Sequence, residues 1–392
     1  MKKAVKLISL NLLICLAFIS CSFQEELYLA HEEEKLTNLS PVMVIPVPAD
    51  TLFPRLLHTQ DQLTFVRGKV DGGLEPWSSA YDDFIDKADA FKTVSHHATD
   101  TVYVPKYYED TPGHRAAKAG ILSDGHGAYT TALAFSLTGD TSYAEKAIYF
   151  LNAWAQTNVA ISHADDSRLI AAYGMAGLLA AADLLMGHTV WPTIDKNQFK
   201  VWLEDVYVPA VATTKAWTDN KGDWGTFAVA ASYHLLEDDT KLAFEINRVK
   251  LRMDKNIASD GHMPKEVLRG VNGLWYTYFA LTPITMTAQL ALNRDQDDIF
   301  NFVPDTAGTL KQALDYLHYY VQHKDEWPHY PMGAGSPQDD DWPVDLLEAM
   351  NDFYDDEYAT FVSGHRPIKG GYDGTTITHS GWFYPTLMKM PR

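Results

Sequence analysis

Three side chains suited to acid–base and anion chemistry occur within a single stretch of this sequence. Glu266 and Arg269 are three residues apart, and Arg269 and Tyr276 are seven apart. Because seven residues make nearly two turns of an α-helix, the spacing predicts that Arg269 and Tyr276 share one helix face. Two glycines between them would leave the backbone open on that side. The stretch therefore predicts a polar cleft wall, on which arginine could bind a carboxylate through two hydrogen bonds.

A second polar stretch precedes an apolar helical pattern at about residue 225. It contains Asn220, Lys221 and Trp224. An asparagine amide could donate a directed hydrogen bond to an anion, and a tryptophan could line a binding surface. Taken alone, the stretch favours a simpler interpretation, in which Asn220 is a turn residue and Trp224 a hydrophobic plug.

Helices must position these groups, because apolar residues recur at helical spacing almost throughout the chain from Thr51. Strand signals are weak, and the best covers 375–378. Amphipathic helices joined by short turns predict helical hairpins that close into an α/α barrel, an incomplete toroid, as one all-α domain. The expected helices cover 77–90, 116–137, 143–154, 167–185, 196–213, 225–236, 241–256, 264–292, 306–322 and 344–354.

The N-terminus has the pattern of an export signal, with a basic start and a short apolar run. The residues Phe-Ile-Ser-Cys at 18–21 resemble a bacterial lipobox, which implies cleavage before Cys21 and lipid attachment to its sulfur. An ordinary secretory peptide cut nearby is the alternative. We expect a signal peptide at 1–20, a lipid-anchored tether at 21–50 and the barrel domain at 51–392. The protein would then be exported and anchored in the periplasm or at the outer membrane.

The charge of the chain limits its partners. The net charge is -19, and removal of the three signal lysines would make it -22. Nucleic acid and anionic lipid are therefore poor partners, and contact with a membrane would run only through the lipid anchor. An anionic polysaccharide could bind only if a locally basic cleft lay inside this acidic shell.

No cofactor and no metal site is predicted. The only cysteines, Cys15 and Cys21, fall in the signal region, and no His-Glu-x-x-His motif occurs. Asp339, Asp340 and Asp341 could bind calcium, although a solvated loop is the simpler interpretation.

The pattern Glu266-Val-Leu-Arg269-Gly, followed by Gly-Leu-Trp-Tyr276 and Phe-Ala-Leu, is similar to that of the alginate lyase superfamily. Asn220-x-x-x-Trp224 resembles the asparagine motif of the same family. Weaker similarity, including 132–140 and 169–185, extends the resemblance over residues 115–290. It implies an α/α barrel and a polysaccharide lyase acting on a uronate polymer, with alginate as the expected substrate and glucuronan or another polyuronate as the alternative.

One departure from the family pattern concerns a histidine. The best-known members carry histidine directly after the asparagine, where this chain has Lys221. Lys221 could act as a substitute cation, a histidine from elsewhere could supply the function, or the substrate could differ. His126, early in the helix expected at 116–137, is the first candidate for that histidine, and a surface histidine is the equal alternative.

The resemblance implies β-elimination at a uronate, in which a base removes the C5 proton and an acid protonates the O4 leaving oxygen. Arg269 and Asn220 would neutralise the carboxylate, and Glu266 could hold the guanidinium of Arg269. Tyr276 is the expected proton-transfer residue, with its pKa lowered by cationic surroundings. Tyr278, which faces elsewhere on the helix, is its competitor.

Two other functions remain open. A glycoside hydrolase would need two carboxyl groups across the cleft, and Asp124 with Glu266 is the only attractive pair. A non-catalytic glycan-binding lipoprotein would need stacking aromatics without a positioned arginine–tyrosine pair. For the predicted lyase, we expect the substrate-binding residues to be Glu266, Trp224, Tyr278 and Asp124.

Overall fold

The computed structural model of the protein describes residues 53–294, 297–330, 343–354, 357–373, 376–379 and 381–390. The predicted signal peptide, Cys21, the tether and the aspartate run at 339–341 lie outside the described residues. The helices are α2 (Gln60–Asp71), α3 (Trp77–Phe91), α4 (Thr111–Thr138), α5 (Thr141–Thr157), α6 (Ser167–Gly174), α7 (Ala176–Met186), α8 (Thr193–Trp202), α9 (Val208–Val211), α10 (Asn220–Leu235), α11 (Asp239–Asn256), α12 (Pro264–Val267), α13 (Gly273–Asn293), α14 (Leu310–Gln322), α15 (Val344–Asn351) and α16 (Ala359–Ser363).

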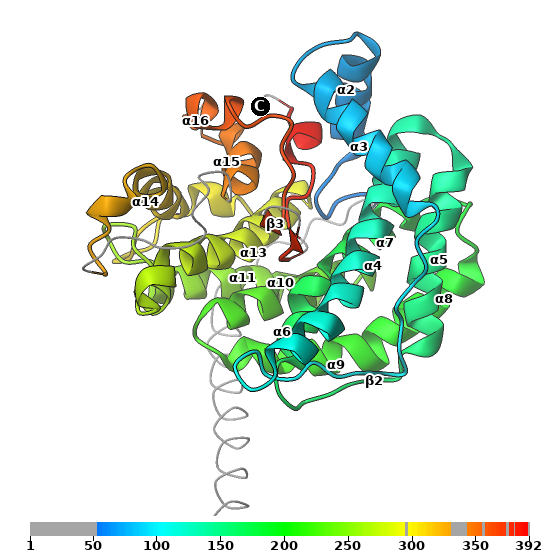
Figure 1. The fold of residues 1–392 in the computed structure, drawn as a ribbon, viewed down its shortest axis with the longest axis horizontal. Coiled ribbons are helices and arrows are strands. Elements are labelled where there is room, and N and C mark those ends of the chain that lie inside the picture. The colour runs from blue at the N-terminus through cyan, green and yellow to red at the C-terminus, as the bar shows by residue number, and fades with distance from the viewer. Residues whose placement is uncertain are drawn as a thin grey trace, which may run out of the picture.

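The helices form an inner and an outer set, which confirms the expected α/α architecture (Figure 1). Helices α4, α7, α10 and α13 pack against one another in sequence and are buried on most sides. Helices α5, α8, α11 and α14 cover them and bury only one face, as their amphipathic sequences predict. The stretch Ser167–Met186 is long and apolar enough to cross a membrane, and 94% of its 18-residue apolar window is buried within the molecule.

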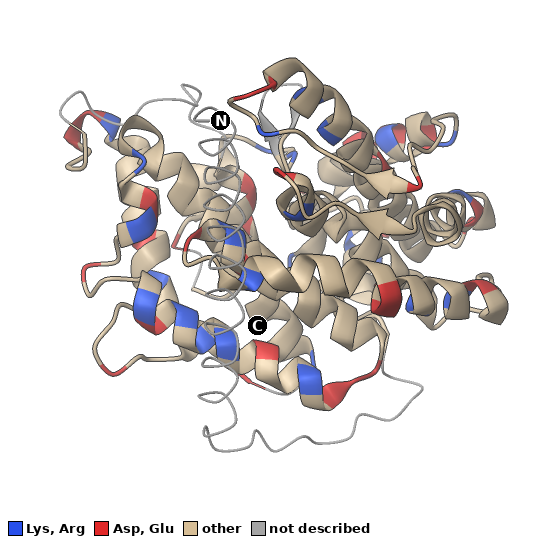
Figure 2. Ribbon diagram, turned by 90° about the horizontal axis from the view of Figure 1, so that it is seen from below, with Lys and Arg blue, Asp and Glu red and all other residues tan. Residues whose placement is uncertain are grey.

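Strands are short, in agreement with the weak strand signals. Strands β1 (Thr101–Val102) and β2 (Ala160–Ile161) pair in parallel beside α4 and α6. Strands β3 (Tyr372–Asp373) and β4 (Thr376–Ile377) form an antiparallel pair, of which β4 lies within the predicted range 375–378. Figure 2 shows that acidic and basic residues are interspersed over the ribbon.

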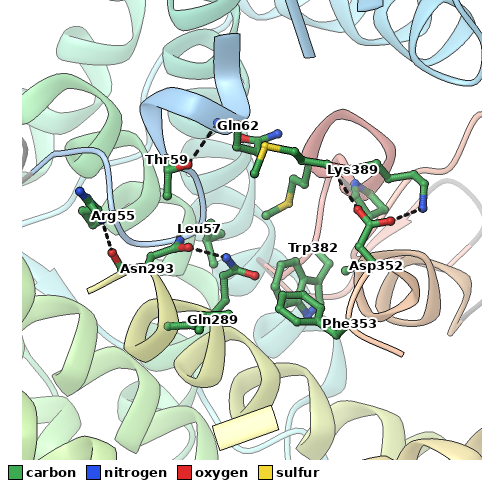
Figure 3. A pocket seen from close by; sticks show the side chains of 15 residues that line it. Arg55, Leu57, Thr59, Gln62, Gln289, Asn293, Asp352, Phe353, Trp382 and Lys389 are labelled. Carbon is green, nitrogen blue, oxygen red and sulfur yellow. Dashed lines mark hydrogen bonds and ion pairs between the residues drawn. The ribbon is translucent and has the colours of Figure 1, made fainter. Parts of the chain in front are cut away.

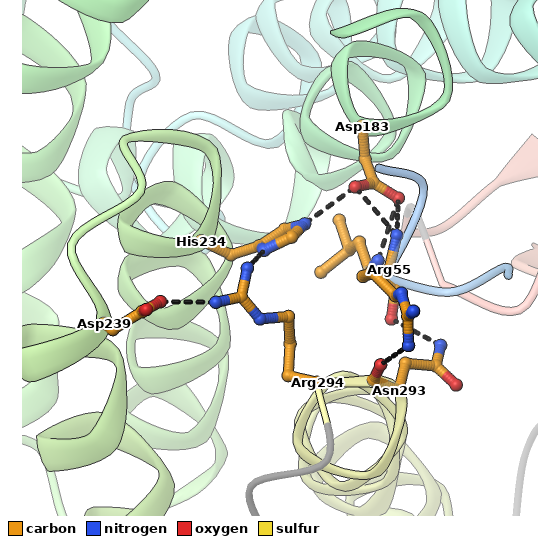
Figure 4. Close-up of polar contacts among 7 residues, drawn as sticks. Arg55, Asp183, His234, Asp239, Asn293 and Arg294 are labelled. Atoms are coloured by element: carbon orange, nitrogen blue, oxygen red, sulfur yellow. Dashed lines mark hydrogen bonds and ion pairs between the residues drawn. The ribbon is translucent and has the colours of Figure 1, made fainter. Parts of the chain in front are cut away.

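A buried polar network ties the start of the barrel to its inner helices (Figure 4). The backbone N–H groups of Arg55 and Leu56 donate to the Asp183 carboxylate on α7. His234 on α10 contacts the same carboxylate through Nε2 at 2.7 Å. Arg294 donates to Nδ1 of His234 at 3.1 Å. Because a guanidinium can only donate, His234 must carry its proton on Nε2. His234 is therefore a core histidine.

Of the helices that carry the site, one predicted helix is interrupted and another begins earlier than predicted. The helix expected at 264–292 is divided into α12, a 3-10 turn (Gly270–Asn272) and α13. Gly270 has a φ of 60°, a left-handed conformation that glycine adopts without strain. Conversely, α10 begins at Asn220 and not near 225, because the Asp219 side chain caps its first turn.

Candidate active site

A cleft of about 590 Å³ lies between two walls of the barrel. One wall consists of the loop before α4, the first turns of α4 and helix α6. The other consists of the start of α10, the 3-10 turn and the start of α13. Its lining residues are Lys106, Tyr107, Tyr108, Glu109, His114, Lys118, Asp166, Leu169, Ile170, Tyr173, Asn220, Lys221, Arg269, Asn272, Trp275, Tyr276 and Phe279. The structure thus brings together four of the predicted residues, Asn220, Lys221, Arg269 and Tyr276.

Glu266 fixes the position of Asn220. Its carboxyl group accepts hydrogen bonds from the backbone N–H of Asn220 at 2.8 Å and from Nδ2 at 2.6 Å. Glu266 is only 1% exposed, so it supports the site from beneath and does not line the cleft. Burial raises the pKa of Glu266 to about 7, and the nearby carboxylates of Asp223 and Asp219 add to the effect.

The expectation that Glu266 holds the guanidinium of Arg269 is wrong. Arg269 instead contacts the Asp219 carboxylate, with 3.2 Å between Nη2 and Oδ2. The carboxyl group of Glu266 is occupied by Asn220, and α12 ends at Val267, before Arg269. The turn at Gly270 also separates Arg269 from the helix that carries Tyr276, so Arg269 and Tyr276 do not share one helix face as expected. The turn still directs Arg269 over Tyr276, with its guanidinium carbon 4.8 Å from the ring centroid.

Tyr276 is half-buried at the cleft. Burial raises its pKa above the usual value of 10, and the Tyr108 hydroxyl beside it acts in the same direction. Arg269 opposes this effect, because a cation stabilises the phenolate. The expectation that cationic surroundings lower the pKa of Tyr276 is therefore wrong. Arg269 lies beside the ring, but burial raises the pKa more than the cation lowers it.

Lys221 lies where the family pattern has histidine. Its ammonium is 3.2 Å from Asp219 Oδ2 and 4.9 Å from the centroid of the Trp217 ring. The same Asp219 oxygen also contacts Arg269. One carboxylate therefore holds two cations at the edge of the cleft.

The structure does not place His126 in the cleft. It is 1% exposed, its Nε2 is 3.0 Å from the Tyr384 hydroxyl, and its ring stacks on Phe383 at 4.3 Å. Burial lowers the pKa of His126 to about 3, so the ring is neutral. The prediction that His126 faces the cleft is wrong, because its position on α4 is directed into the core.

Asp124 and Trp224 are also displaced from the expected lining. Asp124 is fully buried and accepts hydrogen bonds from the backbone and ring of His97 and from Trp154. Trp224 is 0% exposed and packs beneath Tyr173 and Phe279, at ring centroid distances of 5.8 and 5.3 Å. Trp224 is thus the plug of the alternative interpretation and supports the cleft floor.

Tyr278 points into the core, on the side of α13 away from the cleft. Its hydroxyl is 2.9 Å from Asp345 Oδ2 and 2.8 Å from His379 Nε2. Burial raises the pKa of Asp345 to about 7 and lowers that of His379 to about 3. The expectation that Tyr278 contacts substrate is therefore wrong, and Tyr278 is a structural residue of the core.

Sequence reasoning missed the opposite wall. His114 lines the cleft from the first turns of α4, and its Nδ1 is 2.8 Å from the Pro105 carbonyl oxygen. Lys118 follows one turn later, and Tyr173 from α6 lies beside it. Asp110 caps α4 by accepting a hydrogen bond from Gly113 N, so the helix begins five residues before the predicted start. This capping residue was the signal in the sequence that could have placed His114 on the helix.

The cleft is locally basic, as an anionic ligand would require. Four cationic side chains line it, at Lys106, Lys118, Lys221 and Arg269, against the lining carboxylates of Glu109 and Asp166 and that of Asp219 at its edge. The described residues contain no group of three or more His, Cys, Asp or Glu that could hold a metal ion.

A second cavity of about 300 Å³ lies beside the C-terminal end of α13 (Figure 3). Its polar side chains are engaged with one another or with the backbone. Gln62 donates to the Leu387 carbonyl, Lys389 pairs with Asp352 at 2.8 Å, and Gln289 donates to Asn293. It contains no arginine–tyrosine pair like that of the cleft.

Solved structures with the same fold include alginate lyases. A tyrosine-to-phenylalanine variant of alginate lyase A1-III complexed with tetrasaccharide matches with a TM-score of 0.68 at 15% identity, over 88% of this chain and 96% of that one. Alginate lyase A1-III from Sphingomonas species A1 gives 0.63 at 16%, over 88% and 99%. An alginate lyase from Bacteroides ovatus gives 0.63 at 17%, over 86% and 99%. At these identities the likeness shows the fold.

Comparison with curated protein sequences finds no match. The family model for alginate lyase, in contrast, matches residues 75–327 of the 392. This range contains both walls of the cleft and every residue that lines it. The chain therefore belongs to the alginate lyase family and is a polysaccharide lyase.

Proposed function

We propose that the protein cleaves a uronic-acid polymer, with alginate as the favoured substrate, by β-elimination. The observation that carries this proposal is the meeting of Asn220, Arg269 and Tyr276 at one basic cleft, with the guanidinium over the tyrosine ring. The alginate lyase A1-III structure bound to a tetrasaccharide has the same fold, which supports the choice of polymer.

In the proposed reaction the sugar carboxylate binds Arg269 and Asn220, whose amide is fixed in place by Glu266. Neutralisation of this carboxylate makes the C5 proton more acidic and stabilises the enolate-like state. Tyr276 takes the C5 proton as its phenolate, the minor form that the guanidinium of Arg269 stabilises, while the C4–C5 double bond forms and the C4–O4 bond breaks. The tyrosine hydroxyl then returns its proton to the departing O4.

Lys221 serves in this proposal as a fixed cation next to the carboxylate, in place of the family histidine. Among the described residues, His114 is the only histidine that lines the cleft, and its Nδ1 is directed to the Pro105 carbonyl and to Asp166. A single residue, Tyr276, is therefore assigned both proton transfers.

An absorbance assay tests the function. The protein is incubated separately with alginate, with glucuronan and with a neutral glycan, and the ultraviolet absorbance of the unsaturated uronate product is followed. We expect absorbance to rise with alginate and not with the neutral glycan. New reducing ends without this absorbance would show hydrolysis, and binding without either signal would show a glycan-binding protein.

The geometry gives little support to hydrolysis. A glycosidase needs two carboxyl groups facing one bond, one as acid and one as base or nucleophile. Asp124 and Glu266, the pair considered for this role, are both buried away from the cleft surface.

We further propose that the protein is exported and anchored through a lipid on Cys21. The proposal rests on the lipobox-like residues 18–21 and on the apolar run before them. Metabolic labelling with a radioactive fatty acid should mark the wild type and leave Cys21→Ser unlabelled. Labelling of both proteins, or of neither, would contradict it.

A further inference from the structure

The four cations of the cleft differ in their partners. Lys106 pairs with Glu109 at 3.0 Å, and Lys221 and Arg269 share Asp219, each at 3.2 Å. Each of these three cations therefore already has a carboxylate beside it before any ligand enters.

Lys118 differs from these three. It is half-buried on α4 and lines the same cleft, yet it has no anionic partner within the part of the chain that the structure describes. Its ammonium is 5.9 Å from the centroid of the Tyr173 ring. Burial lowers the pKa of Lys118, and the neighbouring Arg115 lowers it further. A cation surrounded by aromatic and cationic groups lacks the counter-charge that partly buried lysines require.

Lys118 and Arg269 approach the cleft from opposite walls. Arg269 lies over Tyr276, so it is placed to hold the carboxylate of the sugar that loses its C5 proton. Lys118 lies beside Tyr173, whose pKa is raised by burial first and then by the charges of the Asp166 carboxylate and of Tyr276. Since each uronate carries a single carboxylate, the anion that would balance Lys118 must come from a different sugar of the chain.

We propose that Lys118 binds the carboxylate of a uronate next to the reacting sugar, and so makes the enzyme select polymers with acidic sugars in succession. This inference rests on the proposed polyuronate function. Lys118 is accordingly a binding and specificity residue, and the proton transfers remain with Tyr276.

The test compares Lys118→Met with the wild type on alginate. Loss of a charge-assisted contact should raise KM about tenfold or more, with kcat changed by less than about threefold. Lys118→Arg should restore most of the affinity, because it restores the cation. Lys106→Met is the matched control: its ammonium already pairs with Glu109 at 3.0 Å, so KM should rise less than in Lys118→Met.

A second substrate makes the test specific for the neighbouring sugar. In alginate with part of its carboxyl groups reduced to alcohols, wild-type kcat/KM should fall steeply as neighbours lose their charge. In Lys118→Met the fall should be shallower, because the contact is already missing. An equally steep fall in both proteins would overturn the inference.

The possible failures are distinguishable. If the wild type forms no unsaturated uronate from any polyuronate, the proposed function is wrong. If the wild type cleaves alginate but Lys118→Met has the same KM, only the role of Lys118 is wrong. A lower kcat with a displaced pH profile would instead assign Lys118 to proton transfer and overturn the binding role. Should Lys118→Met fail to fold, the comparison of Lys118→Arg with Lys118→Gln on both substrates decides.

Discussion

Helix α13 carries two tyrosines, two residues apart, that lie in contrasting surroundings. Tyr276 is half-buried at the cleft with Arg269 over its ring. Tyr278 is buried in the core between Asp345 and His379. Each tyrosine also has a buried carboxyl group of pKa about 7 in its region, Glu266 near the cleft and Asp345 in the core.

The comparison shows that a shifted pKa does not by itself identify a catalytic group. Burial raises the pKa of both tyrosines and of both carboxyl groups. The difference lies in access and in the partner: Tyr276 faces open space and a cation, whereas Tyr278 faces two core side chains. The role of Tyr276 in proton transfer is therefore assigned from its position at the cleft, and its pKa shift only supports that role.

The largest expected effect comes from Tyr276→Phe. Loss of the proton-transfer hydroxyl should lower kcat about 100- to 10,000-fold. The melting temperature should stay close to that of the wild type, because this hydroxyl is at the cleft and not in the core. The absorbance assay on alginate and a thermal melt measure the two quantities. Wild-type kcat in this variant would remove Tyr276 from the mechanism.

The second effect concerns Glu266→Gln. The two N–H donors of Asn220 reach different oxygens of Glu266, and Gln places an NH2 group where one of these oxygens lies, so kcat/KM should fall about 10- to 100-fold. In the wild type, protonation of Glu266 below pH about 7 weakens the same contacts, so kcat/KM should rise as the pH passes through that value. The variant should lack this rise, and retention of it would assign the titration to another group.

Glu266 also predicts the direction of a stability change. Its pKa in the folded protein is about 7, above the ordinary value of 4.5, so its contribution to the free energy of unfolding is complete below pH 4.5 and is lost as the pH rises through about 7. Denaturant unfolding at several pH values should show this loss in the wild type. Glu266→Gln should show a smaller decline, since Asp345 still titrates.

The smallest effect on activity is expected for Tyr278→Phe. This change leaves Asp345 and His379 without their buried partner, which should cost about 1–3 kcal/mol of the free energy of unfolding. The kcat should remain within about threefold of the wild type, because the cleft is unchanged. A large loss of kcat at unchanged stability would remove the contrast between the two tyrosines.

Hydrophobic periodicity was enough to predict the helical fold, because the outer helices bury one face each. It also predicted that Tyr276 and Tyr278 face different sides, since residues two apart point apart on a helix. The same pattern could not orient α4, which is buried on most sides along its second half. For that reason His126 was predicted at the cleft, while His114 and Lys118 on the first turns were missed.

Local conformation limited the prediction in a second way. The pairing of Arg269 with Asp219 depends on a left-handed residue at Gly270 and on a helix that begins at Asn220. Glycine in a helical pattern signals a break only weakly, and residues 50 apart in sequence give no indication of contact. The motif therefore identified the right residues without their partners.

The break at Gly270 places the carboxylate-binding residue and the proton-transfer residue on separate elements, whereas one continuous helix would have carried both. Tyr276 lies on the long inner helix α13, so its position is fixed by the packing of the barrel core. Arg269 lies on a short exposed turn, whose direction can change through substitutions in 268–272 without repacking that core. Substitutions in this turn among relatives can thus alter which anionic sugar is bound, while the proton-transfer residue is preserved. Laboratory evolution for new polymers should begin in this turn.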